Sequence, residues 1–185
     1  VYISSFTVSE REHVVLTQFG KPARTITKAG LHWKRPGLLE TVNRIDCRVH
    51  TFTTQPIQLL LGDKNPIVLT CYICWKVSDP LLFFQSLVST DIAVQKLGDM
   101  VNSQLGNALG DYALSDIINT DPAKVRLDDL ESAIQTNTNS NARRKYGIEV
   151  VQAGIRRIAY PAIVADAVYN RMRSERQKEA KKYRA

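Results

Sequence analysis

The clearest pattern in the chain is a strict alternation of apolar and polar positions between Ile67 and Val77. The apolar positions are Ile67, Leu69, Cys71, Ile73, Trp75 and Val77. Successive side chains of a strand point to opposite faces, so this period predicts a strand with one buried face. The same period occurs at Ile57, Leu59 and Leu61, and a turn over 62–66 separates the two segments. Together they predict a hairpin in a mostly antiparallel sheet.

Shorter strand patterns precede this hairpin. Residues 14–19 form an apolar run that ends at Gly20, and residues 31–33 form a second apolar run. Residues 44–50 alternate between polar and apolar, which predicts a half-buried strand with one face in water. The apolar members of that segment are Ile45, Cys47 and Val49.

A last strand is predicted over 148–158. Its apolar face switches between Val150 and Val151, because both residues are apolar although they are adjacent. A switch of this kind predicts a β-bulge, and Gly154 is a candidate position for it.

Helices are predicted between these strands. Asp79 can cap a helix that starts at Pro80, and a second helix begins after Thr90. The second helix has an apolar residue at every fourth position: Leu97, Val101, Leu105 and Leu109. The sequence Thr-Asp-Pro at 120–122 repeats the cap signal and opens a third helix. The six residues 136–141 are poor helix formers, so we expect the third helix to fray or break there.

A final helix is predicted from Pro161 onward. Its apolar stripe consists of Ile163, Val168, Tyr169 and Met172. After Met172 the helix becomes polar, so it is either exposed to solvent or covered by another chain. Candidate contacts with another chain are Tyr169, Met172, Arg173 and Arg176.

These elements predict an α/β (α+β) fold, in which helices pack on a mostly antiparallel sheet and a long helix then projects. The 185 residues are enough for one domain with its own core. We expect this domain over 1–160, with a strand-rich part (1–78), a helix-rich part (79–147) and the last strand (148–158). Residues 161–185 are expected to be the beginning of a long, truncated C-terminal helix.

The charge of the chain is basic, with 25 Lys and Arg against 18 Asp and Glu and a net charge of +7. Such a balance suits an anionic membrane surface or nucleic acid. The short basic clusters at 143–145 and 156–157 are not interleaved with stacking aromatic residues, and no nucleic-acid motif is present. We therefore expect no nucleic-acid partner; solvated surfaces, or contacts with lipid headgroups, account for the basic residues.

No constellation of residues predicts catalysis. Cys71 and Cys74 have the CxxC spacing, but residues three apart in a strand point to opposite faces with Cα atoms about 10 Å apart, which excludes a disulfide between them. A zinc site would need two further ligands. His13, His32 and His50 are scattered among predicted strands, and no HExxH, GxSxG or phosphate-binding loop occurs. We expect no catalytic, metal-binding or cofactor-binding residues and no cofactor.

The turn that follows the run at 31–33 has apolar residues where polar ones are usual. Leu38 and Leu39 lie beside Lys34 and Arg35, a combination that suits insertion at a membrane interface. The alternative is that both leucines fold back into the core. The four residues are candidate membrane contacts.

Several motifs together resemble the SPFH (Band 7) family. They cover nearly the whole chain in order: 12–21, 30–36 with 40–42, 63–65 leading to 74–80, 146–151, 155–161 and 168–176. The last of these contains Tyr-Asn-Arg-Met-Arg at 169–173, which is more similar to HflC-type members of the family than to stomatin, prohibitin or flotillin.

The resemblance implies a scaffold without catalytic residues. It implies one N-terminal transmembrane anchor in the bacterial inner membrane, with the SPFH domain against the bilayer on the periplasmic side. Copies of the chain would alternate with an HflK-type partner in a closed ring around the membrane protease FtsH and modulate the access of substrates. The alternative is a stomatin-like scaffold on the cytoplasmic side, which binds lipids or channels in membrane microdomains.

Overall fold

A computed structural model of the chain describes residues 5–34, 40–87, 89–119 and 126–161, together with residues 173, 174, 176 and 177. Its centre is a four-stranded antiparallel sheet around β8 (Pro66–Val77). β9 (Ile148–Ala159) pairs with one side of β8 along nearly its whole length. On the other side, β6 (His50–Thr53) and β7 (Ile57–Leu60) pair with its two halves. The predicted hairpin is therefore confirmed.

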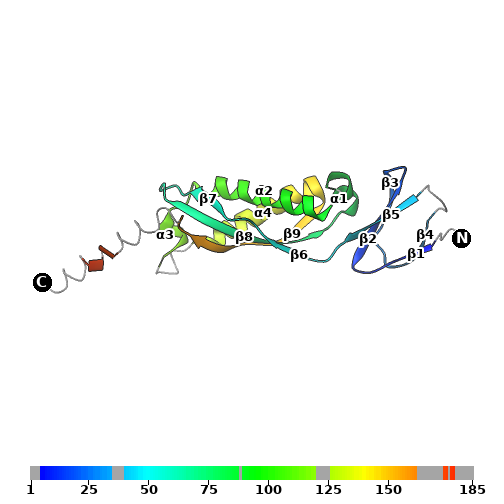
Figure 1. Ribbon diagram of the computed structural model, residues 1–185, viewed down its shortest axis with the longest axis horizontal. Coiled ribbons are helices and arrows are strands. Elements are labelled where there is room, and N and C mark those ends of the chain that lie inside the picture. The colour runs from blue at the N-terminus through cyan, green and yellow to red at the C-terminus, as the bar shows by residue number, and fades with distance from the viewer. Residues whose placement is uncertain are drawn as a thin grey trace.

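Helices cover one face of this sheet (Figure 1). They are α1 (Pro80–Ser86), α2 (Thr90–Leu109) and α4 (Leu127–Tyr146), whereas the short α3 (Leu114–Ile117) lies at one end of the sheet, where Leu114 N donates to Asp63 Oδ2. The six alternating apolar side chains of β8 are all buried, and so are the four apolar residues of the predicted stripe of α2. The side chain of Asp79 accepts hydrogen bonds from the backbone N–H groups of Leu81 and Leu82, which confirms the predicted cap of α1.

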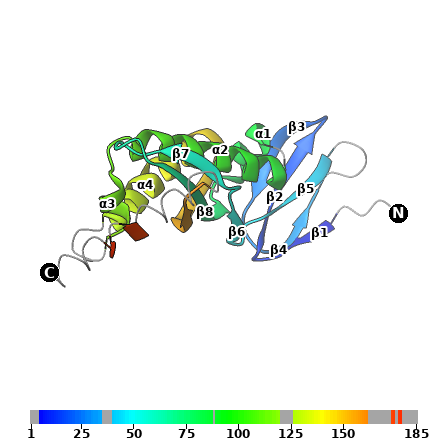
Figure 2. The same ribbon diagram turned by 60° about the vertical axis from the view of Figure 1, so that its left-hand side comes forward.

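Smaller sheets form the N-terminal part of the molecule (Figure 2). β2 (Glu12–Gln18) lies between β3 (Lys21–Ile26) and β5 (Glu40–Asp46), and β1 (Ser5–Val8) pairs with β4 (Gly30–Trp33). One face of β2 buries Val14 and Leu16 with Val8 in a small core of their own. Val15, on the opposite face of β2, joins the main core beneath the helices.

The predicted break in the third helix is wrong, because α4 continues through residues 136–141 to Tyr146. Three polar side chains of α4, spaced four residues apart, bind backbone groups of β9. Glu131 accepts from Ile155 N at 2.7 Å, Gln135 donates to Val151 O at 2.7 Å, and Asn139 accepts from Val150 N at 3.0 Å. Tertiary contacts thus override a weak intrinsic helix propensity.

Two strand predictions also need correction. The strand expected over 44–50 stops at Asp46, and Val49 is 56% exposed in the link to β6. β9 does contain bulges, but the extra residues are Val151 and Arg156, since Gly154 lies directly opposite Tyr72. Gly154 has a different role: a Cβ there would be 2.7 Å from the Tyr72 ring. The bulge at Val151 explains the switch of the apolar face.

Some predicted features lie outside the described residues. These are the cap at 120–122, the apolar stripe of the final helix at 163, 168, 169 and 172, and the membrane candidates Arg35, Leu38 and Leu39. Arg173 and Arg176 are described, and both are helical and exposed.

Candidate functional site

Large apolar side chains are exposed at one end of the small N-terminal sheets. Phe19 is 78% exposed, Trp33 is 68% exposed and Leu31 is 63% exposed. Leu31 and Trp33 are two residues apart in β4, so they share one face of that strand. His32, between them, points the other way and contacts the Phe6 ring at a centroid distance of 6.1 Å.

Strand pairing brings these residues to the same end of the molecule. Gln18 pairs with both Lys21 and Glu40, so the turn that contains Phe19 lies next to the start of β5. Trp33 pairs with Ser5, so the beginning of β1 lies there as well. We call Phe19, Leu31, Trp33 and Lys34 the tip; the strands that carry it are at the right-hand end of Figures 1 and 2.

Phe19 occupies an unfavourable backbone conformation. Its φ is 51° and that of Gly20 is 80°, which are the two positive values of a type I′ turn between paired strands. Such a turn favours Asn, Asp or Gly at both positions, and a bulky residue with positive φ is uncommon. Neither packing among the described residues nor turn preference explains a phenylalanine here, and strained residues of this kind cluster at functional sites.

Arg24 connects the two ends of the segment that contains the predicted membrane contacts. Its Nη2 donates to the carbonyl oxygen of Trp33 at 2.8 Å and lies 3.5 Å from Oε2 of Glu40. Trp33 ends β4 and Glu40 begins β5, so the guanidinium group bridges the residues on either side of 34–39. The Glu40 side chain is only 5% exposed, which makes this ion pair less screened than a surface pair.

The chemistry of the tip suits a lipid interface. Lys21 and Lys34 flank the exposed aromatic residues, and aromatic rings beside cations are typical of protein surfaces at the boundary of an anionic bilayer. Of the four predicted membrane contacts, Lys34 alone is described; it is half-buried and directly follows Trp33. That these residues touch a membrane stays a prediction. Sequence reasoning missed Phe19 and Trp33, although Phe-Gly in a turn between two strands was a usable signal.

The three cysteines lie in different environments. Cys71 is buried in the main core, where burial raises the pKa of its thiol to about 11. Cys74 lies on the other face of β8 and contacts Thr51, its Sγ 3.4 Å from Thr51 Oγ1. The predicted separation of Cys71 and Cys74 is confirmed. Within the described ranges, no three His, Cys, Asp or Glu side chains are grouped so as to hold a metal ion.

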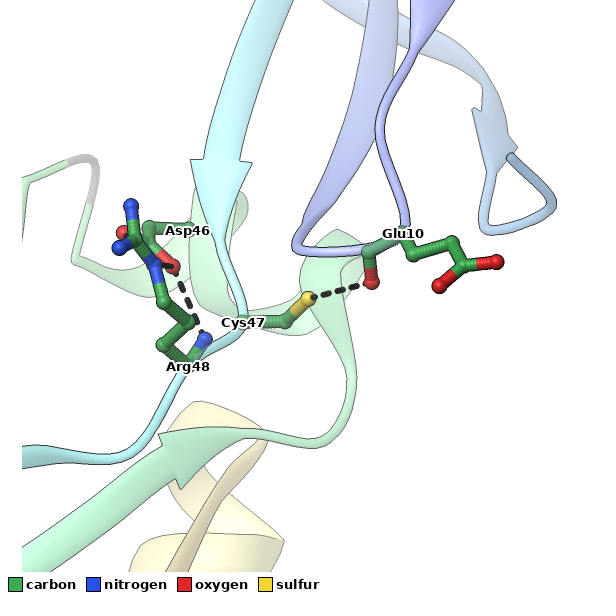
Figure 3. Close-up of polar contacts among 4 residues, drawn as sticks. All are labelled: Glu10, Asp46, Cys47 and Arg48. Carbon is green, nitrogen blue, oxygen red and sulfur yellow. Dashed lines mark hydrogen bonds and ion pairs between the residues drawn. The ribbon is translucent and has the colours of Figure 1, made fainter. Parts of the chain in front are cut away.

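Cys47 lies in the link between the small sheets and the main sheet (Figure 3). Its backbone N–H donates to Arg11 O at 3.0 Å, and its thiol contacts Glu10 O at 3.9 Å. Burial raises the pKa of this thiol. Next to it, the backbone N–H of Arg48 bonds to Asp46 and lowers the pKa of that carboxyl group, with a smaller contribution from the Arg48 side chain. These bonds join the link to residues 10 and 11 between β1 and β2, and Arg48 to Asp46 within the link.

No helix within the described residues is long and apolar enough to cross a bilayer.

The comparisons match nearly the whole chain. The model of the SPFH domain / Band 7 family matches residues 6–185. Protein HflC of Buchnera aphidicola (subsp. Acyrthosiphon pisum) is 30% identical over 98% of this chain and 64% of its own length. The Modulator of FtsH protease HflC of Escherichia coli K12 is 27% identical over 100% of this chain and 67% of its own length. The chain thus spans about two thirds or slightly less of the length of these relatives. It belongs to the SPFH domain / Band 7 family.

Proposed function

We propose that the chain is part of a membrane-anchored scaffold that modulates a membrane protease of the FtsH type. The observation that carries this proposal is the similarity over 100% of the chain to a relative named as a modulator of FtsH protease. An HflC relative from Haemophilus influenzae, 27% identical, also covers the whole chain. The similarity spans the residues of both the small N-terminal sheets and the main sheet.

The scaffold is proposed to work by assembly. Copies of the chain, together with an HflK-type partner, form a closed ring around the protease and limit which substrates reach it. The domain over 1–160 forms the wall, and the helix from 161 onward, with Tyr169, Met172, Arg173 and Arg176, contributes contacts between neighbours. The exposed positions of Arg173 and Arg176 are consistent with such contacts.

The tip is proposed to rest on the bilayer. Phe19, Leu31 and Trp33 insert their side chains at the interface, with Lys34, Arg35, Leu38 and Leu39 of the adjoining segment. Fully burying an aromatic or leucine side chain stabilises an association by roughly 1.5–3 kcal/mol, so three or more such residues suffice for a stable contact next to an anchor. The bilayer is proposed to be the inner membrane, with the domain on its periplasmic side.

A regulator that acts by limiting access to a protease needs no catalytic activity. The only thiol pKa values with a resolved shift are raised, those of Cys47 and Cys71, and a raised pKa makes a thiol a poorer nucleophile at neutral pH. The three histidines lie in three different strands, β2, β4 and β6. We infer that the domain hydrolyses neither peptides nor nucleotides.

The test is the turnover of membrane substrates in cells. The half-lives of substrates of the FtsH-type protease are measured with the full-length protein present, deleted or replaced by a Phe19→Ser, Trp33→Ser variant. An inactive protease serves as the control. We expect deletion to change the half-lives only while the protease is active. Unchanged half-lives would remove the modulator role, and turnover that persists without active protease would favour an enzyme.

A further inference from the structure

In the described part of the molecule, one edge of the main sheet is covered by side chains, and the opposite edge is not. The outer edge of β9 is covered, because Glu131, Gln135 and Asn139 of α4 bond its backbone groups. β6, on the opposite edge, pairs with β8 and with no other strand of the described residues. An unpaired strand edge presents free N–H and C=O groups and can accept an added strand.

The register shows which groups of β6 are free. Thr54 N donates to Cys71 O at 2.8 Å, and Phe52 is paired with Ile73 in the same ladder. In an antiparallel pair the backbone groups of alternate residues point toward the partner strand, so Phe52 and Thr54 face β8. The N–H and C=O groups of Thr51 and Thr53 therefore point outward. No backbone bond to these groups is made from the part of the chain that the structure describes.

A groove runs between this edge and α2. It has a volume of about 660 Å³, within the range of sites that hold ligands. Phe52 and Ile92 provide apolar surface, and Ile92 is 42% exposed. Gly98 lies near Phe52, since a Cβ on Gly98 would be 4.0 Å from the Phe52 ring. A side chain at Gly98 would fill part of the groove beside Phe52.

The charge of the groove is negative. Among the described residues that line it, the charged ones are Asp91 and Asp99, and both are exposed. Neither carboxylate has an ion-pair or hydrogen-bond partner among the described residues. The two are eight residues apart in α2, about 12 Å along the helix. In a strand, residues i and i+4 lie on one face and about 13 Å apart. Two cations with that spacing on an extended segment would match the two carboxylates.

We propose that the groove between β6 and α2 binds an extended basic polypeptide segment of a partner protein, which adds to the edge of β6 as a further strand. The free groups of Thr51 and Thr53 supply the backbone bonds. Phe52 and Ile92 cover the apolar side chains of the segment, and Asp91 and Asp99 pair with Lys or Arg at its positions i and i+4. The site lies on the main sheet, away from the tip, and does not depend on the proposed membrane contact.

The probe is a fluorescein-labelled dodecapeptide that contains Lys-Thr-Val-Thr-Lys, compared with the same peptide containing Glu-Thr-Val-Thr-Glu. Fluorescence anisotropy measures the Kd of each for the protein. We expect the basic peptide to bind at least tenfold more tightly and to weaken as salt is added. Hydrogen exchange should slow at the amides of Thr51 and Thr53 when the basic peptide is bound.

Two pairs of variants separate the backbone bonds from the charges. Thr53→Pro removes an outward N–H without removing a bond to β8. Thr53→Ala keeps that N–H and removes only side-chain groups, the γ-methyl group and the hydroxyl group that accepts from Arg156. We expect at least tenfold weaker binding for Thr53→Pro and less than twofold for Thr53→Ala. Asp91→Asn with Asp99→Asn should weaken binding by at least tenfold, and Asp128→Asn, an exposed acid of α4, should not.

Several results would overturn the proposal. Equal Kd values for the two peptides, equal effects of Thr53→Pro and Thr53→Ala, or no protection of Thr51 and Thr53 at saturation would each do so. If Thr53→Pro lowers the sedimentation coefficient of the protein without peptide, the edge pairs with a second copy of the chain instead. If Thr53→Pro does not fold, two other measurements decide the outcome: hydrogen exchange in the unaltered protein, and the Kd of the basic peptide for the aspartate variants.

Discussion

Gly147 lies so close to Asp79 that a Cβ on Gly147 would come within 2.5 Å of the Asp79 carbonyl oxygen. The carbonyl oxygen of Gly147 in turn accepts the backbone N–H groups of Ser78 and Asp79, both at 2.9 Å. Gly147, which follows α4 and leads into β9, is thereby joined to Asp79, which follows β8 and caps α1. Two connections that are about 70 residues apart in sequence meet at this one point.

We predict that Gly147→Ala destabilises the protein by about 2–4 kcal/mol, because it combines a positive φ of 65° with a collision against backbone. The free energy of unfolding in urea measures this. Gly20→Ala is the matched control: its φ is 80° but nothing lies within 4 Å of the added Cβ, so it should cost only about 1–2 kcal/mol. Equal costs for the two variants would contradict the role of the Asp79 contact.

A second prediction concerns the polar side chains of α4 that hold β9. Asn139→Ala removes the acceptor of Val150 N and leaves a partly buried N–H without a partner, which should cost about 1–3 kcal/mol. Asn137→Ala, on the exposed side of the same helix, should be neutral or slightly stabilising, because alanine has the higher helix propensity. Chemical denaturation of both variants checks this. If Asn137→Ala is the more destabilising, α4 is not held by its contacts with β9.

The tip gives a prediction in which stability and binding change in opposite directions. Phe19→Asn places a residue that tolerates positive φ in the turn, so the free energy of unfolding should rise by about 1 kcal/mol. Binding to anionic vesicles should weaken by about tenfold, since an aromatic side chain no longer inserts. Thermal unfolding and vesicle sedimentation measure the two effects.

The control for the tip is Val49→Asn, which replaces an exposed apolar residue in the link, away from the tip. It should leave vesicle binding unchanged. Leu38→Ser with Leu39→Ser tests the adjoining segment, and we expect weaker vesicle binding at nearly constant melting temperature. A large fall in melting temperature with unchanged binding would mean that these leucines are core residues.

The pH dependence of stability should include a contribution from Asp63. The pKa of this carboxyl group is lowered first by the backbone N–H of Leu114 at 3.0 Å and then by bonds from Asn65. A lowered folded-state pKa stabilises the fold above the unfolded value of about 4, and this stabilisation is lost as the pH falls through the folded pKa. Asp63→Asn should therefore reduce stability at pH 7 and have progressively less effect toward pH 3. Urea titrations from pH 7 to pH 3 measure it, and a difference that grows toward acid would contradict the assignment.

The sequence predicted best those elements whose periodicity decides their burial. The alternation along β8 and the fourfold spacing in α2 each indicated an element and its inward face, because one side of each is fully buried. β3 was missed: it contains Lys21, Pro22 and Arg24, lies at the edge of its sheet, and has little apolar alternation. The strand expected over 44–50 failed because periodicity does not reveal where a chain passes from one sheet to another.

The site was predictable only in part, for a similar reason. An apolar turn near Lys34 was visible in the sequence, whereas the joining of Phe19, Trp33 and Glu40 at one end depends on strand register. The continuity of α4 was also beyond local reasoning. Intrinsic propensity disfavours a helix over 136–141, and only the position of Asn139 beside the β9 bulge shows why it persists.

β8 and β9 run together for 12 residues each, a paired beam about 40 Å long. The small sheets with the tip adjoin one end of this beam, and β9 ends at the other (Figure 1). Because the tip is proposed to rest on the bilayer, the length of this beam sets the distance between the tip and Pro161, from which the chain continues. Inserting two residues in each strand would keep every side chain on its face and lengthen that reach by about 7 Å. The length of this one strand pair would then determine the size of any enclosure built from such subunits.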